Sequence, residues 1–182
     1  MKHMTLISFE CKLLSIKDWT LIRLPKAISQ QLSSRGMVMV EALIQDMTIK
    51  LPLEPDGLGS HWFRIMPDLL EKAGLKPGDT INVSIRQIEE WIEPNVPEDI
   101  ETALHVFEAK NQWYEITTKA RWEWIRWIQS TKNQETRERR IKTACSMLIN
   151  GKRRPCCFNY SICTETYISK NGMLILNNLQ PE

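Results

Sequence analysis

The amino-acid sequence predicts an α+β protein, in which a small pseudo-symmetric β-barrel with short capping helices precedes a C-terminal module of three helices. Strand-like stretches dominate residues 5–92, and only two short helix signals interrupt them. Helical periodicity takes over after the proline-rich segment 94–97. We therefore expect three parts: a barrel domain (1–93), a helical module (94–154) and a cysteine-containing extension (155–182).

Six stretches of the first part have the apolar and β-branched content of strands: Leu6–Ile16, Trp19–Leu24, Met37–Ile44, Met47–Leu53, Trp62–Met66 and Thr80–Ile88. Two short helices are expected between them, at Pro25–Ser33 and Pro67–Ala73. Each begins with a proline, whose fixed φ and missing N–H suit the first turn of a helix.

The prolines also reveal a weak internal repeat. Pro25 is followed by Gly36, and Pro67 by Gly78. The two prolines are 42 residues apart, and so are the two glycines. Each segment reads as strand, helix, glycine turn and strand, which predicts a pseudo-twofold barrel. A chance coincidence of two common strand–helix–strand segments is the alternative.

Each helix of the second part has an expected apolar face. These faces lie within Ile100–Phe107 for the first helix, Trp124–Ile128 for the second and Ile141–Leu148 for the third. Pro97 opens the first helix, and Asn133 suits the start of the third as Gly151 suits its end. Trp122 falls outside the apolar face of the second helix.

Charge is unevenly distributed, although the net charge of the chain is only +2. Residues 119–154 carry 11 Lys and Arg against 3 Asp and Glu, whereas residues 1–118 carry 12 against 17. This surplus predicts a candidate surface for an anionic partner, either nucleic acid or phosphate, with Trp122 available for stacking on a base. Its cations are Lys132, Arg137, Arg139, Arg140 and Lys142. A solvated helix face is the simpler interpretation.

Arg137 has a second possible role. It lies one turn before Ile141 and so points along the apolar face of its helix, where a cation needs a carboxylate or carbonyl partner. Asp99 and Glu98 are the nearest candidates within the module. A structural ion pair and a ligand for an anion both stay open.

Few motifs indicate chemistry. Phosphate loops, dinucleotide fingerprints and nucleophile motifs are absent from the sequence, so we expect no catalytic residues, no metal and no cofactor. No apolar run is long enough for a membrane span. If the barrel encloses a cavity for a small ligand or a substrate, the nearest chemical groups are Glu41, Asp46, His61 and Asp79, whose spacing selects no reaction.

The extension after residue 154 suggests a hairpin. Asn171-Gly172 suits a type I′ turn between short apolar stretches, and an isolated hairpin must dock on the body of the protein to be stable. The five cysteines are odd in number and clustered late, which favours free thiols in a reducing cytoplasm over a disulfide framework.

Particular motifs carry two family resemblances. Val96-Pro97-Glu98-Asp99, the run from Lys132 through Glu135-Thr136-Arg137 to Arg140-Ile141, and Gly151-Lys152 resemble the YdeI/OmpD-associated, or bacteriocin-protection, family. The strand end Trp19–Pro25, the segment Leu51–Gly59 and Gly74–Asp79 resemble the DUF1905 family, a domain of unknown function. The first resemblance implies tolerance of antimicrobial peptides or envelope stress, and the second implies a small β-barrel without established catalytic residues.

The resemblances favour a non-enzymatic, cytoplasmic binding or stress-protection protein of bacteria. Two alternatives stay open: a nucleic-acid or phosphate-binding protein that uses residues 119–154, and a small-ligand carrier or enzyme that uses the barrel cavity. Edge strands and an exposed Trp122 would also permit a homodimer.

Overall fold

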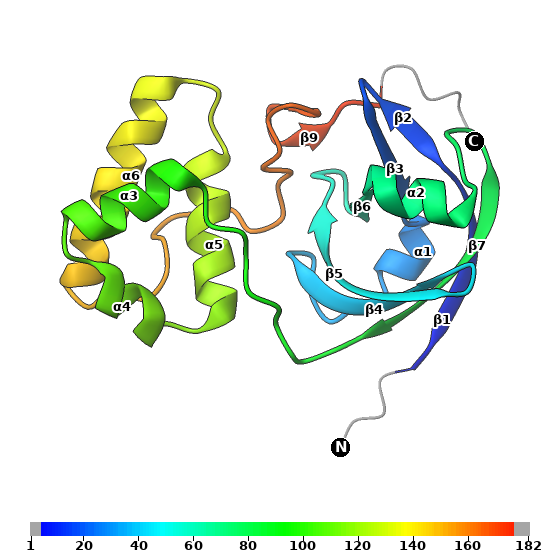
Figure 1. The fold of residues 1–182 in the computed structure, drawn as a ribbon, viewed down its shortest axis with the longest axis horizontal. Coiled ribbons are helices and arrows are strands. Elements are labelled where there is room, and N and C mark those ends of the chain that lie inside the picture. Colours follow the sequence, from blue (N-terminus) through cyan, green and yellow to red (C-terminus); the bar gives the residue numbers. More distant parts are fainter. Residues whose placement is uncertain (1–4, 177–182) are drawn as a thin grey trace. The chain divides into compact units, whose positions relative to one another are not determined.

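The computed structural model describes residues 5–176, and the chain divides into two compact units (Figure 1). We call them the sheet unit and the helical unit. Of the described residues, the sheet unit holds 5–90, 160–163 and 167–176. The helical unit holds residues 91–159 and 164–166. The extension is therefore shared between the two units.

The sheet unit contains a curled, antiparallel sheet of seven strands in the order β1-β7-β4-β5-β6-β3-β2. Its strands are β1 (Ile7–Lys12), β2 (Leu14–Ile16), β3 (Trp19–Arg23), β4 (Val38–Ile44), β5 (Met47–Pro55), β6 (His61–Ile65) and β7 (Thr80–Gln87). Sequence patterning placed each of these regions, except that Leu13 divides the first one. Because β1 and β2 form the two edges of the sheet, one bent segment contributes to both ends.

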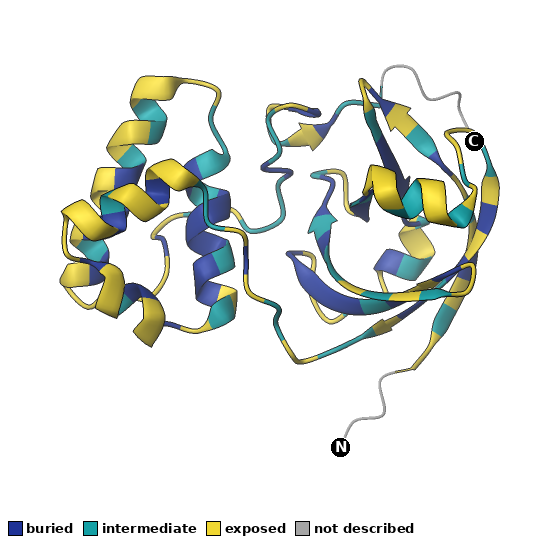
Figure 2. Cartoon of the chain, viewed as in Figure 1, coloured by how far each residue is buried: buried dark blue, intermediate teal, exposed yellow. Residues whose placement is uncertain are grey.

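Alternation of apolar and polar residues builds the core of this unit, and Figure 2 shows the buried residues of its strands in dark blue. In β7, Ile81, Val83 and Ile85 are buried, while the residues between them face outward or lie half-buried. They pack with inward residues of β4, such as Val40 and Ile44, in one continuous hydrophobic cluster. A period of two residues places every second side chain on the same face of a strand.

Two short helices accompany the sheet, α1 (Lys26–Ser29) and α2 (Pro67–Ala73). The bounds of α2 match the prediction, and Gly74 ends it in the left-handed conformation. The first helix is shorter than the predicted Pro25–Ser33. After Gln30, backbone N–H groups donate to side chains and not to helical carbonyl groups. Gln87 accepts the N–H of Ser33, and Ser34 accepts the N–H of Gly36.

The two repeated segments pair with each other in the sheet. Strand β3 of the first segment pairs with β6 of the second, and β4 of the first pairs with β7 of the second. The two glycines are not equivalent, because Gly78 has a φ of 94° whereas Gly36 is buried against Tyr160. The pseudo-twofold symmetry itself stays a prediction.

The C-terminal extension docks on the sheet unit through a short hairpin, β8 (Ser169–Lys170) and β9 (Met173–Leu174). Its turn residues Asn171 and Gly172 have φ values of 55° and 76°, as a type I′ turn requires. Ile168 and Leu174 are buried in a second apolar cluster with Trp62. The backbones also meet, since Leu174 donates its N–H to the Asp56 carbonyl at 2.8 Å.

The helical unit contains four helices over residues 91–159, all of which the structure describes, so the prediction of three is wrong. They are α3 (Glu98–Val106), α4 (Lys110–Glu115), α5 (Thr118–Gln129) and α6 (Gln134–Ile149). The unexpected helix, α4, forms because the predicted connection between the first two helices carries buried apolar anchors. Trp113 and Ile116 join the core cluster of this unit.

Other sequence signals of this unit match the structure. Thr117 accepts the N–H of Ala120 at 3.2 Å, and Asn133 accepts the N–H of Thr136 at 2.7 Å, so both side chains cap their helices. The buried stripe of α6 consists of Ile141, Ala144, Cys145 and Leu148. Among residues 5–176, no helix is long and apolar enough to cross a membrane.

Arg137 joins α6 to α3 through Asp99. Its Nε and Nη2 atoms donate to the two carboxylate oxygens at 2.6 and 2.9 Å, which gives a bidentate ion pair. The side chain of Arg137 is 20% exposed and that of Asp99 is 42% exposed, so the pair is only partly shielded from water. Donation from Arg137 is the main reason that the pKa of Asp99 lies below its ordinary value.

The variant Arg137→Ala should lower the free energy of unfolding by about 1–2 kcal/mol, between the values for exposed and fully buried ion pairs. Arg139→Ala is the matched control, because Arg139 is exposed on the same helix. It should change the free energy by less than about 0.5 kcal/mol. Urea unfolding at pH 7 measures both variants, and equal stabilities would contradict the structural role of Arg137.

The loss caused by Arg137→Ala should also depend on pH. A carboxyl group whose pKa falls on folding adds stability above its unfolded pKa, about 4 for aspartate, and this contribution disappears as the pH falls through the folded pKa. The difference between wild type and Arg137→Ala should therefore be complete at pH 7 and shrink below pH ~4. A difference that grows on acidification would contradict the assignment.

Candidate functional site

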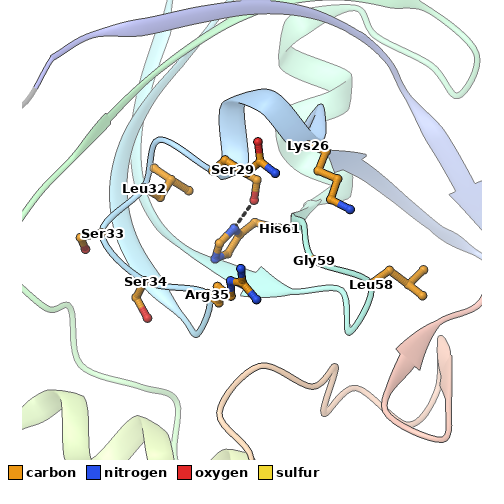
Figure 3. Close-up of a pocket in the computed structure, with 10 residues that line it drawn as sticks. Lys26, Ser29, Leu32, Ser33, Ser34, Arg35, Leu58, Gly59 and His61 are labelled. Atoms are coloured by element: carbon orange, nitrogen blue, oxygen red, sulfur yellow. Dashed lines mark hydrogen bonds between the residues drawn. The ribbon is translucent and has the colours of Figure 1, made fainter.

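A polar cavity of about 520 Å³ opens in the sheet unit beside α1. This volume lies in the range of ligand pockets. The cavity is bordered by α1, by the loop before β4 and by the turn between β5 and β6. The lining residues are Lys26, Ser29, Gln30, Leu32, Ser33, Ser34, Arg35, Leu58, Gly59 and His61 (Figure 3). We call this cavity the α1 pocket.

The turn that forms one wall of the pocket is held by Asp56. This side chain is fully buried, and its Oδ1 accepts the N–H groups of Leu58 and Ser60 at 2.7 and 2.9 Å. Its Oδ2 accepts from Arg23 Nε at 2.8 Å. A buried carboxylate is tolerated only when its oxygens are bonded in this way. The turn therefore has a fixed shape, which positions Gly59 and His61 at the pocket.

His61 lies at the base of the pocket and is 2% exposed. Its Nε2 lies 2.8 Å from the carbonyl oxygen of Gly36, which can only accept, so this nitrogen carries a proton. In the neutral ring Nδ1 is then an acceptor, and it receives a hydrogen bond from the hydroxyl of Ser29. Figure 3 shows the Ser29 hydroxyl pointing to the imidazole ring.

The electrostatics of the pocket favour an anion. Lys26 and Arg35 are among the lining residues, and the described lining contains no carboxylate. Gly59 has a φ of 93°, a backbone conformation that favours glycine, and its Cα faces the side chain of Lys26 across the pocket wall. With the hydroxyl groups of Ser33 and Ser34, the pocket offers donors of the kind that bind phosphate or carboxylate oxygens.

Of the four groups that the sequence offered for a barrel cavity, the structure places one in the α1 pocket, His61. The other three lie elsewhere in the sheet unit. Glu41 accepts from Arg86 Nη2 at 2.5 Å, and Asp79 accepts the N–H of Lys76 at 2.9 Å. Asp46 is exposed beyond the end of β4.

Several members of the predicted anion surface are engaged within the helical unit. Arg137 pairs with Asp99, while Glu98, the other candidate partner, is exposed in the first turn of α3. Arg140 donates to the Trp127 carbonyl at 2.7 Å and to Ser130 Oγ at 2.8 Å. Trp122 donates its indole N–H to the Ile92 carbonyl at 2.7 Å. The guanidinium of Arg140 therefore caps the end of α5.

Other cations of this segment also bond internally. Arg121 donates to Glu93 and to the carbonyl groups of Trp113 and Ile116, and Arg154 pairs with Glu123 at 2.5 Å. The predicted cations that stay exposed are Lys132, Arg139 and Lys142. Much of the positive surplus in residues 119–154 thus serves the structure of the unit itself.

The thiols form no disulfide in the structure. Cys145 and Cys163 are buried, whereas Cys156 and Cys157 are exposed with their sulfur atoms 3.2 Å apart. Burial raises the pKa of the half-buried Cys11 thiol to about 11. Within residues 5–176, no group of three or more His, Cys, Asp or Glu side chains is arranged to hold a metal ion.

Sequence reasoning missed most of the α1 pocket. Ser29 and His61 are 32 positions apart and share no motif. Lys26 lies in the segment predicted only as a helix, Pro25–Ser33, and Arg35 follows it without any motif of its own. No local signal links these residues, because their contacts join segments that lie far apart in the sequence.

Comparison with known families agrees with the motifs. Residues 9–85 match the model of DUF1905, a domain of unknown function, and this range contains the whole α1 pocket. Residues 93–151 match the family described as bacteriocin-protection, YdeI or OmpD-associated, and this range contains α3 to α6. No curated protein matches the chain. The chain therefore carries a DUF1905 segment followed by a segment of the YdeI or OmpD-associated bacteriocin-protection family.

Proposed function

We propose that this protein is a binding protein whose sheet unit holds a small organic anion in the α1 pocket, through a phosphate or carboxylate group. One observation carries this function: the pocket is lined by two cations, Lys26 and Arg35, and its described lining contains no carboxylate that could neutralise them. A cavity lined by unneutralised cations and hydroxyl groups binds anions better than cations or apolar molecules.

The rigidity of the walls supports this function. Ser60 donates its hydroxyl to the Leu24 carbonyl at 2.6 Å, and Asp56 fixes the turn that precedes it. A preformed site loses little conformational entropy when a ligand binds. The energy of each contact with the anion is then available for affinity.

A surface for nucleic acid on the helical unit is supported less well. Arg137, Arg140 and Trp122 already bond to protein groups, and releasing them would cost those bonds. The segment still exposes other cations, among them Lys132, Arg139, Lys142, Lys152 and Arg153, so salt-dependent binding of a phosphate backbone stays the second candidate function.

The family name of the helical segment suggests the setting of this binding. We propose a protective role against bacteriocins or envelope stress in bacteria, exercised in the cytoplasm. The odd number and late clustering of the five cysteines support that compartment, because a disulfide framework would favour an even, regularly spaced set.

Titration of the full chain with inorganic phosphate should shift the amide NMR signals of residues 29–36 and 58–61. Lys26→Ala/Arg35→Ala should weaken phosphate binding at least tenfold, because each charge-assisted contact contributes about 1.5–3 kcal/mol. Lys72→Ala/Lys76→Ala is the matched control, since it removes two exposed cations from the same unit. Its affinity should equal that of wild type.

Two results would contradict the proposed function. One is an equal loss of affinity in the control variant, which would indicate a general charge effect. The other is phosphate-induced shifts confined to residues 132–142, which would place anion binding on α6 instead.

The protective role is tested in a deletion strain of the organism of origin. Loss of the gene should increase sensitivity to a bacteriocin or a membrane-active peptide. The wild-type gene should restore tolerance, and Lys26→Ala/Arg35→Ala should restore it less well at equal protein level. Unchanged sensitivity of the deletion strain would count against the role.

A further inference from the structure

Ser29 has a chemical environment that the neighbouring pocket serines lack. Its hydroxyl donates to His61 Nδ1, while the opposite ring nitrogen donates to the Gly36 carbonyl. The hydroxyl groups of Ser33 and Ser34 are used differently: Ser33 Oγ accepts from Gln87 Nε2, and Ser34 Oγ accepts the N–H of Gly36. Among the described serines of this pocket, Ser29 is the one that has an imidazole base.

This arrangement has the parts that an activated serine requires. A serine hydroxyl becomes nucleophilic when a base can take its proton and a third group fixes the orientation of that base. Here the Gly36 carbonyl is the third group, because it holds the proton on Nε2 and leaves Nδ1 free of one. A carbonyl stabilises the imidazolium less than a carboxylate would, so the activation is weaker than in a triad with aspartate.

Ser29 is also placed at the cavity. It is 4% exposed and lies on the four-residue helix α1, yet it lines the same 520 Å³ pocket as Lys26 and Arg35. These cations would orient an anionic substrate. They would also stabilise the negative charge that develops on an oxygen during attack.

We infer that Ser29 is a nucleophile, with His61 as its general base, toward small esters that carry an anionic group. Ser29 Oγ forms a bond to the ester carbonyl carbon as its proton moves to His61 Nδ1. When the ester C–O bond breaks, the leaving alcohol takes that proton. Water then repeats the sequence, which releases the carboxylic acid and restores Ser29. The inference rests on the proposed function, because the same pocket binds the anionic group.

A fluorophosphonate tests the inference on the full wild-type chain, so that no substitution is needed. Attack by Ser29 forms a phosphorus–oxygen bond and breaks the phosphorus–fluorine bond, with fluoride leaving and the proton passing to the buffer. Peptide mass spectrometry should find one label, on Ser29, and no label on Ser33 or Ser34. Labelling should disappear in urea, which separates Ser29 from His61.

Substitutions of Ser29 and His61 test the role of each residue separately. Ser29→Ala should abolish the label, whereas Ser15→Ala, a control at an exposed serine of the same unit outside the pocket, should retain it. His61→Gln should slow labelling by roughly 10²-fold or more, as loss of a general base usually does. Its circular dichroism must match wild type for the comparison to count.

Three outcomes would contradict the assignment of Ser29 as a nucleophile. They are an unlabelled Ser29 in the folded chain, equal labelling of Ser29 in urea, and labelling of Ser33 or Ser34 at the same rate as Ser29. The proposed function fails separately. If phosphate binds but Ser29 is not labelled, the pocket binds anions without a reactive serine. If Ser29 is labelled but phosphate does not bind, the pocket is not an anion site, and only the assignment of Ser29 as a nucleophile is supported.

Discussion

The buried carboxylate of Asp56 is the interaction on which the features of the sheet unit depend. The two carboxylate oxygens accept hydrogen bonds from the N–H groups of Leu58 and Ser60 and from the side chain of Arg23. The backbone of Asp56 adds two more: its N–H donates to the Ser60 carbonyl, and its carbonyl accepts from the N–H of Leu174. A buried charge is destabilising unless such partners surround it. Because several partners are backbone groups of one turn, satisfying this charge fixes the shape of the turn.

Two further features follow from the fixed turn. On one side it carries Gly59 and leads directly into His61, so the α1 pocket acquires a rigid wall. On the other side Gly57 meets the C-terminal hairpin: a Cβ on residue 57 would lie 2.0 Å from the carbonyl oxygen of Gly172, so only glycine fits. The hydrogen bond from Tyr167 to Asp18, at 2.5 Å, adds a second attachment, and it lowers the pKa of Asp18. The pocket and the docked extension thus share one support.

The sequence predicted the features that local chemistry determines. Strand alternation, the proline that opens α2 and the cap Asn133 are all encoded within a few residues. The site depends instead on distant partners. The hydrogen bonds of Asp56 with Arg23 and of His61 with Ser29 join residues more than 30 positions apart, so they depend on the folded sheet. Likewise, the charge surplus of residues 119–154 suggested a binding surface, because sequence cannot tell an arginine bonded to carbonyl groups from one in solvent.

Amide hydrogen exchange in Asp56→Ala tests most directly the claim that one carboxylate supports both the pocket and the hairpin. Asp46→Ala is the control, since Asp46 is exposed at another turn of the same sheet. Removing Asp56 should cost about 2–4 kcal/mol, because Arg23 and two N–H groups lose their partner. The amides of Leu58, Ser60 and Leu174 should exchange at least tenfold faster, while those of Val40 and Val83 keep their relative protection. Unchanged protection at Ser60 and Leu174 would contradict the account.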